Sequence, residues 1–339
     1  MDPRGFPTSL PEFQRVFPND AACANYLEKL RWPNGFICPD CGKTGEPYRF
    51  HARPSVLRCR QCKFNTSPLS GTVMQSTHTP LSIWFWGGYL VTTQTPGQSA
   101  LQFQRQLGLS RYETAFQLLH KLRSGMVRPE RDCIGGEHVV ELDECFIGGR
   151  AQGEQSRIHR MATIVGAVEV RLRKDGEARA AKHRQDHDGG VPLKKLVYAG
   201  RLRLRVIEGP TVDELVPFIM GNIVKGSTVR TDGNRAYLGL PSLGYTHDPL
   251  TVAGDPEKAE AHLPMIHLVF SNLKTWILGT HHGAIAQHHL QAYLNEYVFR
   301  FNRRFYPMTA FNSALGLASH SVPPTYAALY SGDWVHPVS

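Results

Sequence analysis

The sequence contains no long apolar run. Its most apolar stretch, residues 83–91, is far too short to cross a bilayer. Residues 1–19 are rich in proline and interrupted by charges, so they do not resemble a secretory signal. We therefore expect a cytoplasmic protein that has no membrane partner.

Acidic residues are outnumbered by basic ones. The 339 residues include 38 Lys and Arg but only 29 Asp and Glu, which gives a formal net charge of +9 at pH 7. A surplus of this size favours a polyanionic partner, with nucleic acid ahead of membrane. The charge alone fits a generic basic enzyme equally well. The length is enough for more than one domain.

Cysteine is scarce, but four of the seven cysteines form two close pairs, Cys38 with Cys41 and Cys59 with Cys62. A CxxC turn aims two thiolates at one tetrahedral ion, and the interval between the pairs suits a hairpin. A thioredoxin-like redox pair would explain one CxxC but not two. The spacing therefore predicts a structural Zn²⁺ in a zinc ribbon over residues 36–70.

The residues around these cysteines complete the N-terminal prediction. Tyr48, Phe50 and Phe64 are expected to cover the small core of the ribbon, and the basic residues between the pairs face either DNA or solvent. Ahead of the ribbon, residues 1–35 are predicted to form two short helices that Pro18 separates.

Residues 80–128 have a helical pattern that is interrupted twice. A short helix over 99–107 is followed by a turn at Gly108, and Ser110 is a suitable N-cap for a helix that runs to about Gly125. Two helices joined by such a turn are typical of a helix-turn-helix, although any helical hairpin would share the pattern. The side chains expected to contact DNA are Arg111, Tyr112, Gln117 and Lys121, with His120 beside them.

Asp143 lies in a short apolar and β-branched run within residues 139–150, and two glycines, Gly148 and Gly149, follow that run. This pattern is typical of a buried strand followed by a turn. A carboxylate inside such a strand is costly unless something holds it, and a metal ion is the usual partner. Glu141 shares a strand face with Asp143 and is the candidate for a supporting acid.

Further strands are expected after residue 160. They cover 160–170, 201–207, 227–233 and 246–252, and the second of these alternates arginine with apolar residues, which predicts a half-exposed strand that is basic on one face. Thr211 and Glu214 form a capping-box sequence at the start of a helix that runs to about residue 224. The histidines and acids of 182–188 are expected in a solvated loop rather than a metal site.

Three adjacent strands, a helix and then a strand that ends in Asp232 follow the order of an RNase H-like fold. We therefore predict an α/β domain with a mixed sheet over residues 135–305. In that fold, carboxylates from the first and fourth strands meet and hold two divalent ions, and hard oxygen ligands suit Mg²⁺ or Mn²⁺.

Several separate motifs carry a family resemblance. They are Glu141–Glu144 with Gly148-Gly149, Arg230–Gly233, Ser271–Lys274, Gly279–Gly283 and Tyr293–Arg304. Together they resemble bacterial insertion-sequence transposases of the ISXO-like group, which pair a zinc ribbon with a DDE-type domain. The resemblance implies metal-dependent cutting of transposon ends and strand transfer into target DNA, with catalytic carboxylates at Asp143 and Asp232. It also implies double-stranded DNA as the partner, a homodimer or larger assembly on DNA, and association with the nucleoid.

The third ligand departs from the family pattern. Related enzymes have a Glu about thirty-five residues after the second Asp and a Lys seven residues later; here His267 and Lys274 stand at these positions. Asn272 is the second candidate and Glu296 the third. Because histidine brings no negative charge, such a site should hold Mg²⁺ weakly and accept Mn²⁺ relatively well. Two simpler interpretations stay open. His267 could be only a polar residue on a packed helix, and Glu296 could be paired with Arg300.

The end of the chain carries further basic residues. Arg300, Arg303 and Arg304, with Lys274, would lie near phosphates, or the arginines would cap a helix end. The aromatic residues of this region are expected in the core rather than against bases, and the histidine pairs at 281–282 and 288–289 are not assigned to a metal. Residues 306–339 are predicted to be an irregular tail.

Two other functions fit the same sequence. A DNA-binding regulator with a decayed catalytic domain is suggested by the missing third Glu. A nuclease of the same fold would stop at cleavage.

Overall fold

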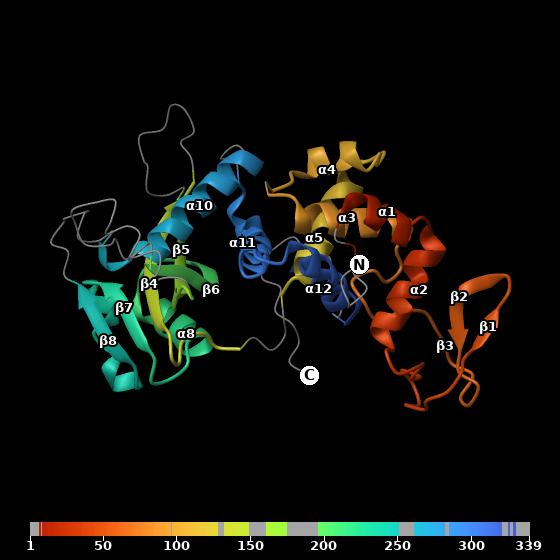
Figure 1. Cartoon of the computed structure of the whole chain (residues 1–339), viewed down its shortest axis with the longest axis horizontal. Helices are drawn as coiled ribbons and strands as arrows, with labels where there is room; N and C mark the ends of the chain where they lie inside the picture. The colour runs from red at the N-terminus through yellow and green to blue at the C-terminus, as the bar shows by residue number, and fades with distance from the viewer. Residues whose placement is uncertain are drawn as a thin grey trace. The chain divides into compact units, whose positions relative to one another are not determined.

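The computed structural model describes residues 9–95, 97–127, 132–148, 161–174, 196–250, 261–281 and 285–320, together with positions 7, 325, 328 and 329. The chain divides into two compact units (Figure 1). Unit 1 contains residues 1–129 and 303–339, and unit 2 contains residues 130–302. No helix among the described residues is both long enough and apolar enough to cross a membrane.

Unit 1 begins with the two predicted helices, α1 (Leu10–Val16) and α2 (Asp20–Arg31). Asn19 caps α2 by accepting a hydrogen bond from the backbone N–H of Ala22 at 3.0 Å. Phe13 is fully buried, so the helices are fixed by aromatic packing rather than by their own length.

The zinc-ribbon segment forms a three-stranded antiparallel sheet of β1 (Tyr48–Phe50), β2 (Arg53–Arg58) and β3 (Asn65–Thr66). Its core differs from the prediction. The apolar cluster consists of Trp32, Phe36, Leu57 and ligand-position cysteines. Tyr48 and Phe64 are 48% and 43% exposed, because short strands leave one sheet face uncovered.

The predicted helix-turn-helix is formed by α4 (Ala100–Gln106) and α5 (Tyr112–Gly125), which follow α3 (Leu81–Thr93). Gly108 has a φ of +63°, and the N–H of Leu109 donates to the carbonyl of Gln104 at 3.0 Å. This is a glycine-terminated helix end of the Schellman type. The N-cap of α5 is Arg111 rather than Ser110, and its side chain makes no capping hydrogen bond.

The expected irregular tail contains a helix, α12 (Pro307–His320), which packs against α2, α3 and α5 within unit 1. Phe311 is buried against Phe13, Phe17 and Phe85, with ring centroids 5.5, 5.8 and 6.0 Å away. The two ends of the chain therefore share one aromatic core. Pro307 is the first residue of α12, and proline is tolerated in the first turn of a helix.

Unit 2 is built on a five-stranded mixed sheet in the order β6-β5-β4-β7-β8. The strands are β4 (Val139–Ile147), β5 (Ala162–Leu172), β6 (Val197–Ile207), β7 (Thr228–Asp232) and β8 (Thr246–Leu250). β4, β5 and β6 are antiparallel, and β7 and β8 continue parallel to β4. This confirms the predicted RNase H-like order.

Helices cover both faces of this sheet (Figure 1). On one face, α10 (Pro264–His281) and α11 (Gln287–Phe301) pack over Cys145, Ile147 and the β5–β6 pair. On the other face, α8 (Val212–Asn222), η1 (Arg235–Tyr237) and η2 (Pro241–Leu243) cover Val140 and Leu142. Alternation along β4 thus decides which side chains face α10. Thr211 precedes α8, but its side chain forms no cap, so the predicted capping box is absent.

The outer edge of β6 is protected by α11. Asn302 accepts from the backbone N–H of Leu202 at 2.8 Å and donates to its carbonyl at 3.2 Å, and Gln291 accepts from the N–H of Val206 at 2.9 Å. These amides take the positions that a neighbouring strand would occupy. The sheet edge is therefore closed to further strands.

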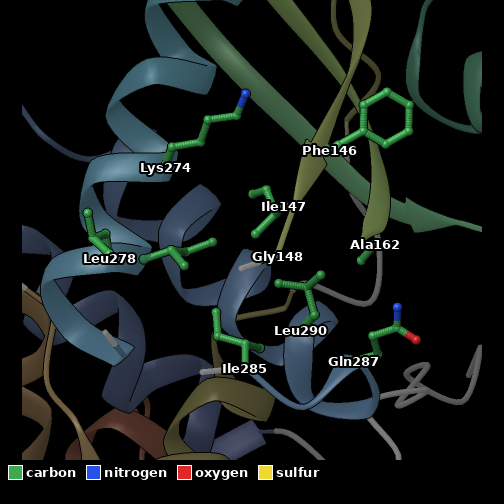
Figure 2. A pocket seen from close by; sticks show the side chains of 10 residues that line it. Phe146, Ile147, Gly148, Ala162, Lys274, Leu278, Ile285, Gln287 and Leu290 are labelled. Atoms are coloured by element: carbon green, nitrogen blue, oxygen red, sulfur yellow. The ribbon is translucent and has the colours of Figure 1, made fainter. Parts of the chain in front are cut away.

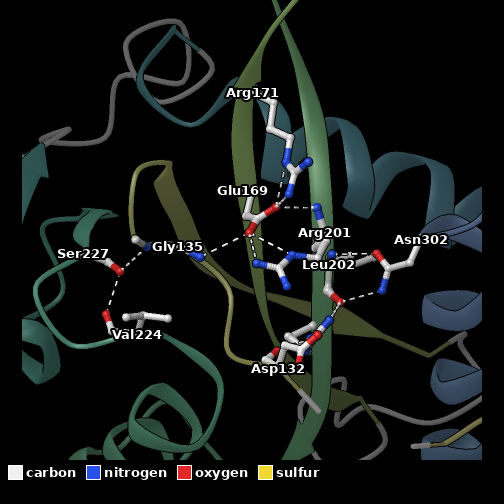
Figure 3. A network of polar contacts seen from close by, with 11 residues as sticks. Asp132, Gly135, Glu169, Arg171, Arg201, Leu202, Val224, Ser227 and Asn302 are labelled. Atoms are coloured by element: carbon white, nitrogen blue, oxygen red, sulfur yellow. Dashed lines mark hydrogen bonds and ion pairs between the residues drawn. The ribbon is translucent and has the colours of Figure 1, made fainter.

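Glu169, on β5, is a buried carboxylate that several donors surround (Figure 3). Arg201 donates through its side chain at 2.7 and 3.0 Å and through its backbone N–H at 3.1 Å, Arg171 donates through Nε at 2.9 Å, and the N–H of Gly135 donates at 3.2 Å. Burial by itself would raise the pKa of Glu169, but these hydrogen bonds outweigh it and lower the pKa to about 2.

The same network corrects the prediction for β6. Arg201 is bound to Glu169, and Arg203 is only 6% exposed, with its guanidinium donating to the carbonyls of Leu202 and Asp132 at 3.0 and 2.6 Å. Arg203 is therefore buried and Arg201 is bound to an acid, so of the three alternating arginines only Arg205 is exposed as the prediction expects. Charge alternation shows which residues share a face, but it does not show what covers that face.

Replacing Glu169 tests this network. We expect Glu169→Gln to lower the free energy of unfolding at pH 7 by about 3 kcal/mol, the low end for breaking a buried pair, because the arginines keep partial solvent contact. The charge of Glu169 contributes its full stabilising free energy above the unfolded-state pKa of about 4.3. This stabilisation is lost as the pH falls through the folded-state pKa of about 2. Urea unfolding between pH 7 and pH 2.5 measures this.

The matched control is Glu208→Gln, because Glu208 is an exposed glutamate just beyond the end of β6. It should change the free energy of unfolding by no more than about 0.5 kcal/mol. An equal effect of both substitutions would show that the Glu169 network does not stabilise the sheet.

Candidate functional site: carboxylates and cysteines

Asp143 and Asp232 lie on neighbouring parallel strands. In the β4–β7 pairing, Val140 is opposite Val229 and Glu141 is opposite Arg230. Continuing this register by two residues brings Asp143 level with Asp232 and on the same sheet face, with strands about 4.8 Å apart. Burial raises the pKa of Asp232, and the negative charge of Asp143 adds to that shift. The two carboxylates therefore influence each other.

The motif around Asp232 is anchored on its other side by β8. Arg230 donates to Asp248 at 3.0 Å, and the buried hydroxyl of Thr231 lies 2.9 Å from Nε2 of His247. Asp232 itself accepts a hydrogen bond from the N–H of Asn234 at 3.0 Å. Each residue of the Arg-Thr-Asp sequence thus has a separate structural partner.

Helix α10 begins on the carboxylate of Glu141. Oε2 of Glu141 accepts from the backbone N–H groups of Met265 and Ile266 at 2.7 and 2.8 Å. Free N–H groups in the first turn of a helix bind anions in this way. Glu141 is fully buried, and this burial raises its pKa to about 7 despite the two N–H donors. The predicted supporting acid therefore fixes the start of α10.

This anchor brings His267 to Asp143. Nε2 of His267 lies 3.2 Å from Oδ2 of Asp143, and the two side chains are 32% and 16% exposed. Of the three candidates for the third ligand, His267 is the one in contact with Asp143.

The other two candidates are elsewhere. Asn272 is exposed, and its position five residues after His267 turns it away from that helix face. Glu296 is 1% exposed and bonded to Arg300, on its own helix, at 3.1 Å. The side chain of Arg300 is 12% exposed, which leaves little of it accessible to a phosphate.

Lys274 lies two turns after His267, on the same face of α10. Burial raises the pKa of the Cys145 thiol to about 12, and the positive charge of Lys274 opposes that rise. Figure 2 shows the Lys274 side chain extending from α10 toward β4. β4 and α10 therefore run side by side, with Glu141, Asp143 and Cys145 facing successive turns of the helix.

An open, mainly apolar pocket of about 300 Å³ continues this line beyond Cys145 (Figure 2). Its residues come from the end of β4, the start of β5, α10 and the start of α11. They are Phe146, Ile147, Gly148, Ala162, Lys274, Ile277, Leu278, Ile285, Gln287 and Leu290. Among the described residues that line it, Lys274 is the one charged side chain, so this end of the site is basic and the end at Asp143 is acidic.

A divalent ion fits the chemistry of this cluster. Asp143 and Asp232 supply hard oxygen atoms, and Oε1 of Glu141, on the same strand face, is buried without a hydrogen-bond partner among the described residues. The donor types at this end of the sheet therefore match a site for a divalent ion.

The four cysteines are gathered as predicted. Their Sγ atoms all lie within 4.8 Å of one another, and two of the separations are 3.6 Å, between Cys38 and Cys62, and 3.7 Å, between Cys41 and Cys59. A tetrahedral zinc with Zn–S bonds of about 2.3 Å requires sulfur atoms about 3.8 Å apart. The cysteines therefore fit Zn²⁺.

Two matching turns hold these cysteines. The N–H groups of Gly42 and Lys63 donate to the carbonyls of Cys38 and Cys59 at 2.9 and 3.1 Å. Gly42 and Lys63 both have positive φ, at 68° and 62°. The sequence does not reveal this for Lys63, because a lysine seldom adopts that conformation.

The predicted DNA contacts on α5 differ in accessibility. Arg111 and Tyr112, at its start, are exposed, Gln117 and Lys121 are half-buried, and His120 is 1% exposed. Burial also lowers the pKa of Lys121. The first turn of α5 is its most exposed part, and the N-terminal residues of a recognition helix are the ones that reach the bases.

The remaining predicted residues have mixed surroundings. Arg303 and Arg304 are half-buried, and the guanidinium of Arg304 lies 4.4 Å from the ring centre of Phe305. The aromatic residues of α11 are core residues, as predicted: Tyr293, Tyr297 and Phe299 are at most 7% exposed. Gly149, the 182–188 cluster and His282 lie outside the described residues.

Comparison with known proteins gives two family matches. Residues 134–302 match the ISXO2-like transposase domain, and residues 18–65 match the transposase zinc-ribbon domain. The chain is also similar to an uncharacterised protein in the transposable element ISH50 of Halobacterium salinarum. The two are 23% identical over 296 residues, which cover 84% of this chain and 92% of the relative.

Zinc removal tests the cysteine cluster. We expect about one equivalent of Zn²⁺ per purified chain, and we expect Cys38→Ser to lose it and to unfold the ribbon, since zinc supplies roughly 10–16 kcal/mol in small domains of this kind. Elemental analysis and the fluorescence of Trp32, which is 9% exposed in the ribbon core, report the two effects. Cys133→Ser, outside the ribbon, is the control and should keep the metal. Full zinc content in Cys38→Ser would contradict the assignment.

Proposed function

The chain belongs to the ISXO2-like family of insertion-sequence transposases, and we propose that it cuts the ends of a transposon and joins them to target DNA. The observation that carries this proposal is the parallel pairing of β4 with β7, which brings Asp143 level with Asp232. Carboxylates at this point of an RNase H-like sheet suit phosphodiester chemistry that depends on a divalent ion.

In this proposal Asp143 and Asp232 hold Mg²⁺ or Mn²⁺. The bound ion would supply charge neutralisation at the phosphate and activation of a water or a 3′-hydroxyl. Lys274 provides a point charge for a neighbouring phosphate, supported by its place on the same helix face as His267. The chemistry includes both hydrolysis of the phosphodiester and its transesterification.

His267 is the proposed third ligand. The 3.2 Å separation between its Nε2 and Asp143 supports it ahead of the exposed Asn272 and of Glu296, which is paired with Arg300. An imidazole ligand leaves the site with less negative charge than three carboxylates. We therefore infer that Mn²⁺, which accepts nitrogen more readily than Mg²⁺ does, supports higher activity.

Unit 1 is proposed to bind the terminal inverted repeats. The zinc ribbon exposes Tyr48 beside Phe50, whose ring lies 5.3 and 5.1 Å from the guanidinium groups of Arg53 and Arg58. A basic surface with aromatic rings suits nucleic acid. The first turn of α5, with Arg111 and Tyr112, would read the groove, and Arg303 and Arg304 would contact phosphates. Joining two ends calls for at least two protomers on cytoplasmic, nucleoid-associated DNA.

A second candidate is a regulator that binds DNA without cutting it. It is favoured by one observation: the residue beside Asp143 is His267 rather than a glutamate, so the site carries less negative charge for a divalent ion. A nuclease that stops at cleavage shares every feature of the site.

Removing the central carboxylates tests the proposal. We expect Asp143→Asn and Asp232→Asn each to lower cleavage and strand transfer by a factor on the order of 10³, because charge stabilisation at the reacting phosphate is lost. Binding to the inverted repeats should stay at the wild-type level, since unit 1 is unchanged. A strand-transfer assay with labelled ends and a gel-shift assay measure the two properties.

The outcomes separate the candidates. Joined product from the wild type supports a transposase, nicks alone indicate a nuclease, and binding alone indicates a regulator. Wild-type strand transfer by Asp143→Asn would overturn the assignment of the site.

The third ligand has its own test. His267→Ala should lower cleavage by roughly 10²-fold or more, whereas Asn272→Ala, an exposed position on the same helix, should stay within about twofold. The assay is repeated with Mg²⁺ and Mn²⁺. A larger loss at Asn272 than at His267 would move the third ligand to Asn272.

A further inference from the structure

Asp143 is flanked by two acids that bind different parts of unit 2. Glu141 accepts two N–H groups from the first turn of α10, the helix that carries His267. Glu144, on the opposite face of β4, accepts a hydrogen bond from the hydroxyl of Tyr237 in η1, the turn that follows Asp232. The two acids flanking Asp143 are therefore attached to the two segments that carry the other proposed ligands.

We propose that Glu144 and Tyr237 are positioning residues that hold Asp232 level with Asp143. This inference rests on the proposed function, because it concerns the carboxylates that would bind the divalent ion. Neither residue is proposed to touch the ion or the DNA.

The backbone pairing stops short of the site. The β4–β7 ladder consists of the Val140–Val229 and Glu141–Arg230 pairs, two residues before Asp143 and Asp232. Beyond it, two like-charged carboxylates lie side by side, and their repulsion favours separation of the strands. The Tyr237–Glu144 hydrogen bond joins the two chain segments immediately past the end of the ladder.

The link from Asp232 to Tyr237 is short and held by side chains. Asp232 accepts the N–H of Asn234, and Asn234 in turn accepts the N–H of Ala236, both at 3.0 Å. Two successive turns of this type fix the backbone between them. Tyr237 is fully buried in the core under α8, so its ring cannot swing away. The hydrogen bond that holds the hydroxyl of Tyr237 therefore also restricts the position of Asp232.

Glu144 could instead act through its charge, as a ligand of the ion. Glutamine separates the two roles. The side-chain oxygen of Glu144→Gln still accepts from Tyr237, but the charge is gone. A positioning role survives this substitution, and a ligand role does not.

The experiment measures Mn²⁺ affinity of the full-length, zinc-loaded protein without DNA, by titration calorimetry. Tyr237→Phe and Glu144→Ala should each weaken binding by roughly tenfold, as loss of a group that orients a metal ligand does. Glu144→Gln should stay within about twofold of the wild type. Thermal melts confirm that each variant is folded at the assay temperature.

Tyr245→Phe is the matched control. Tyr245 is a buried tyrosine of the same core, and its hydroxyl donates to the carbonyl of Ile223 at 3.2 Å, away from Glu144. It should lose a similar amount of stability and keep its Mn²⁺ affinity. An equal loss of affinity in Tyr245→Phe and Tyr237→Phe would show a general effect on folding and overturn the inference.

Asp143→Asn distinguishes the inference from the proposed function. If Asp143→Asn binds Mn²⁺ as the wild type does, the proposed metal site and the positioning role both fail. If Asp143→Asn loses Mn²⁺ while Tyr237→Phe and Glu144→Ala keep it, only the positioning role fails. If Glu144→Gln loses as much affinity as Glu144→Ala, Glu144 acts through its charge and the positioning role is wrong.

Discussion

Two carboxylates of like charge, Asp143 and Asp232, lie side by side on parallel strands of the sheet in unit 2. Such a pair is unfavourable in the absence of a cation, so the surrounding structure must hold it together. Glu141 fixes the start of α10, and Tyr237 reaches across to Glu144. The strand that carries the site is thus tied to its neighbours through polar contacts on both faces.

The rest of unit 2 gives this strand a rigid setting. The buried carboxylate of Glu169 accepts hydrogen bonds from Arg171 and Arg201. Glu169 therefore joins β5 to β6 without leaving its charge unpaired. Asn302 and Gln291 close the free edge of β6. Since β5 and β6 are joined and the free edge of β6 is closed, this side of the sheet supports β4 in the register that brings the carboxylates together.

Sequence reasoning succeeded where a local pattern determines the outcome. The CxxC spacing, the strand that ends in Asp232 and the Gly108 turn each depend on a few neighbouring residues. It failed where the outcome depends on what covers a surface. Arg201 and Arg203 of β6 are bound instead of contributing to a free basic face, Tyr48 and Phe64 are exposed instead of buried, and the tail contains α12. For the arginines and the tail, the deciding contacts come from residues distant in the chain, and for Tyr48 and Phe64 the short strands leave a sheet face uncovered.

The sequence by itself determined the ligand types, the order of the strands and the family, because these follow from residue identity and spacing. Tertiary structure decided which of His267, Asn272 and Glu296 meets Asp143, since that depends on where α10 begins on Glu141. It also revealed the link between Tyr237 and Glu144, which are 93 residues apart. No local pattern signals such a pair, because only the parallel pairing of β4 with β7 brings the two segments together.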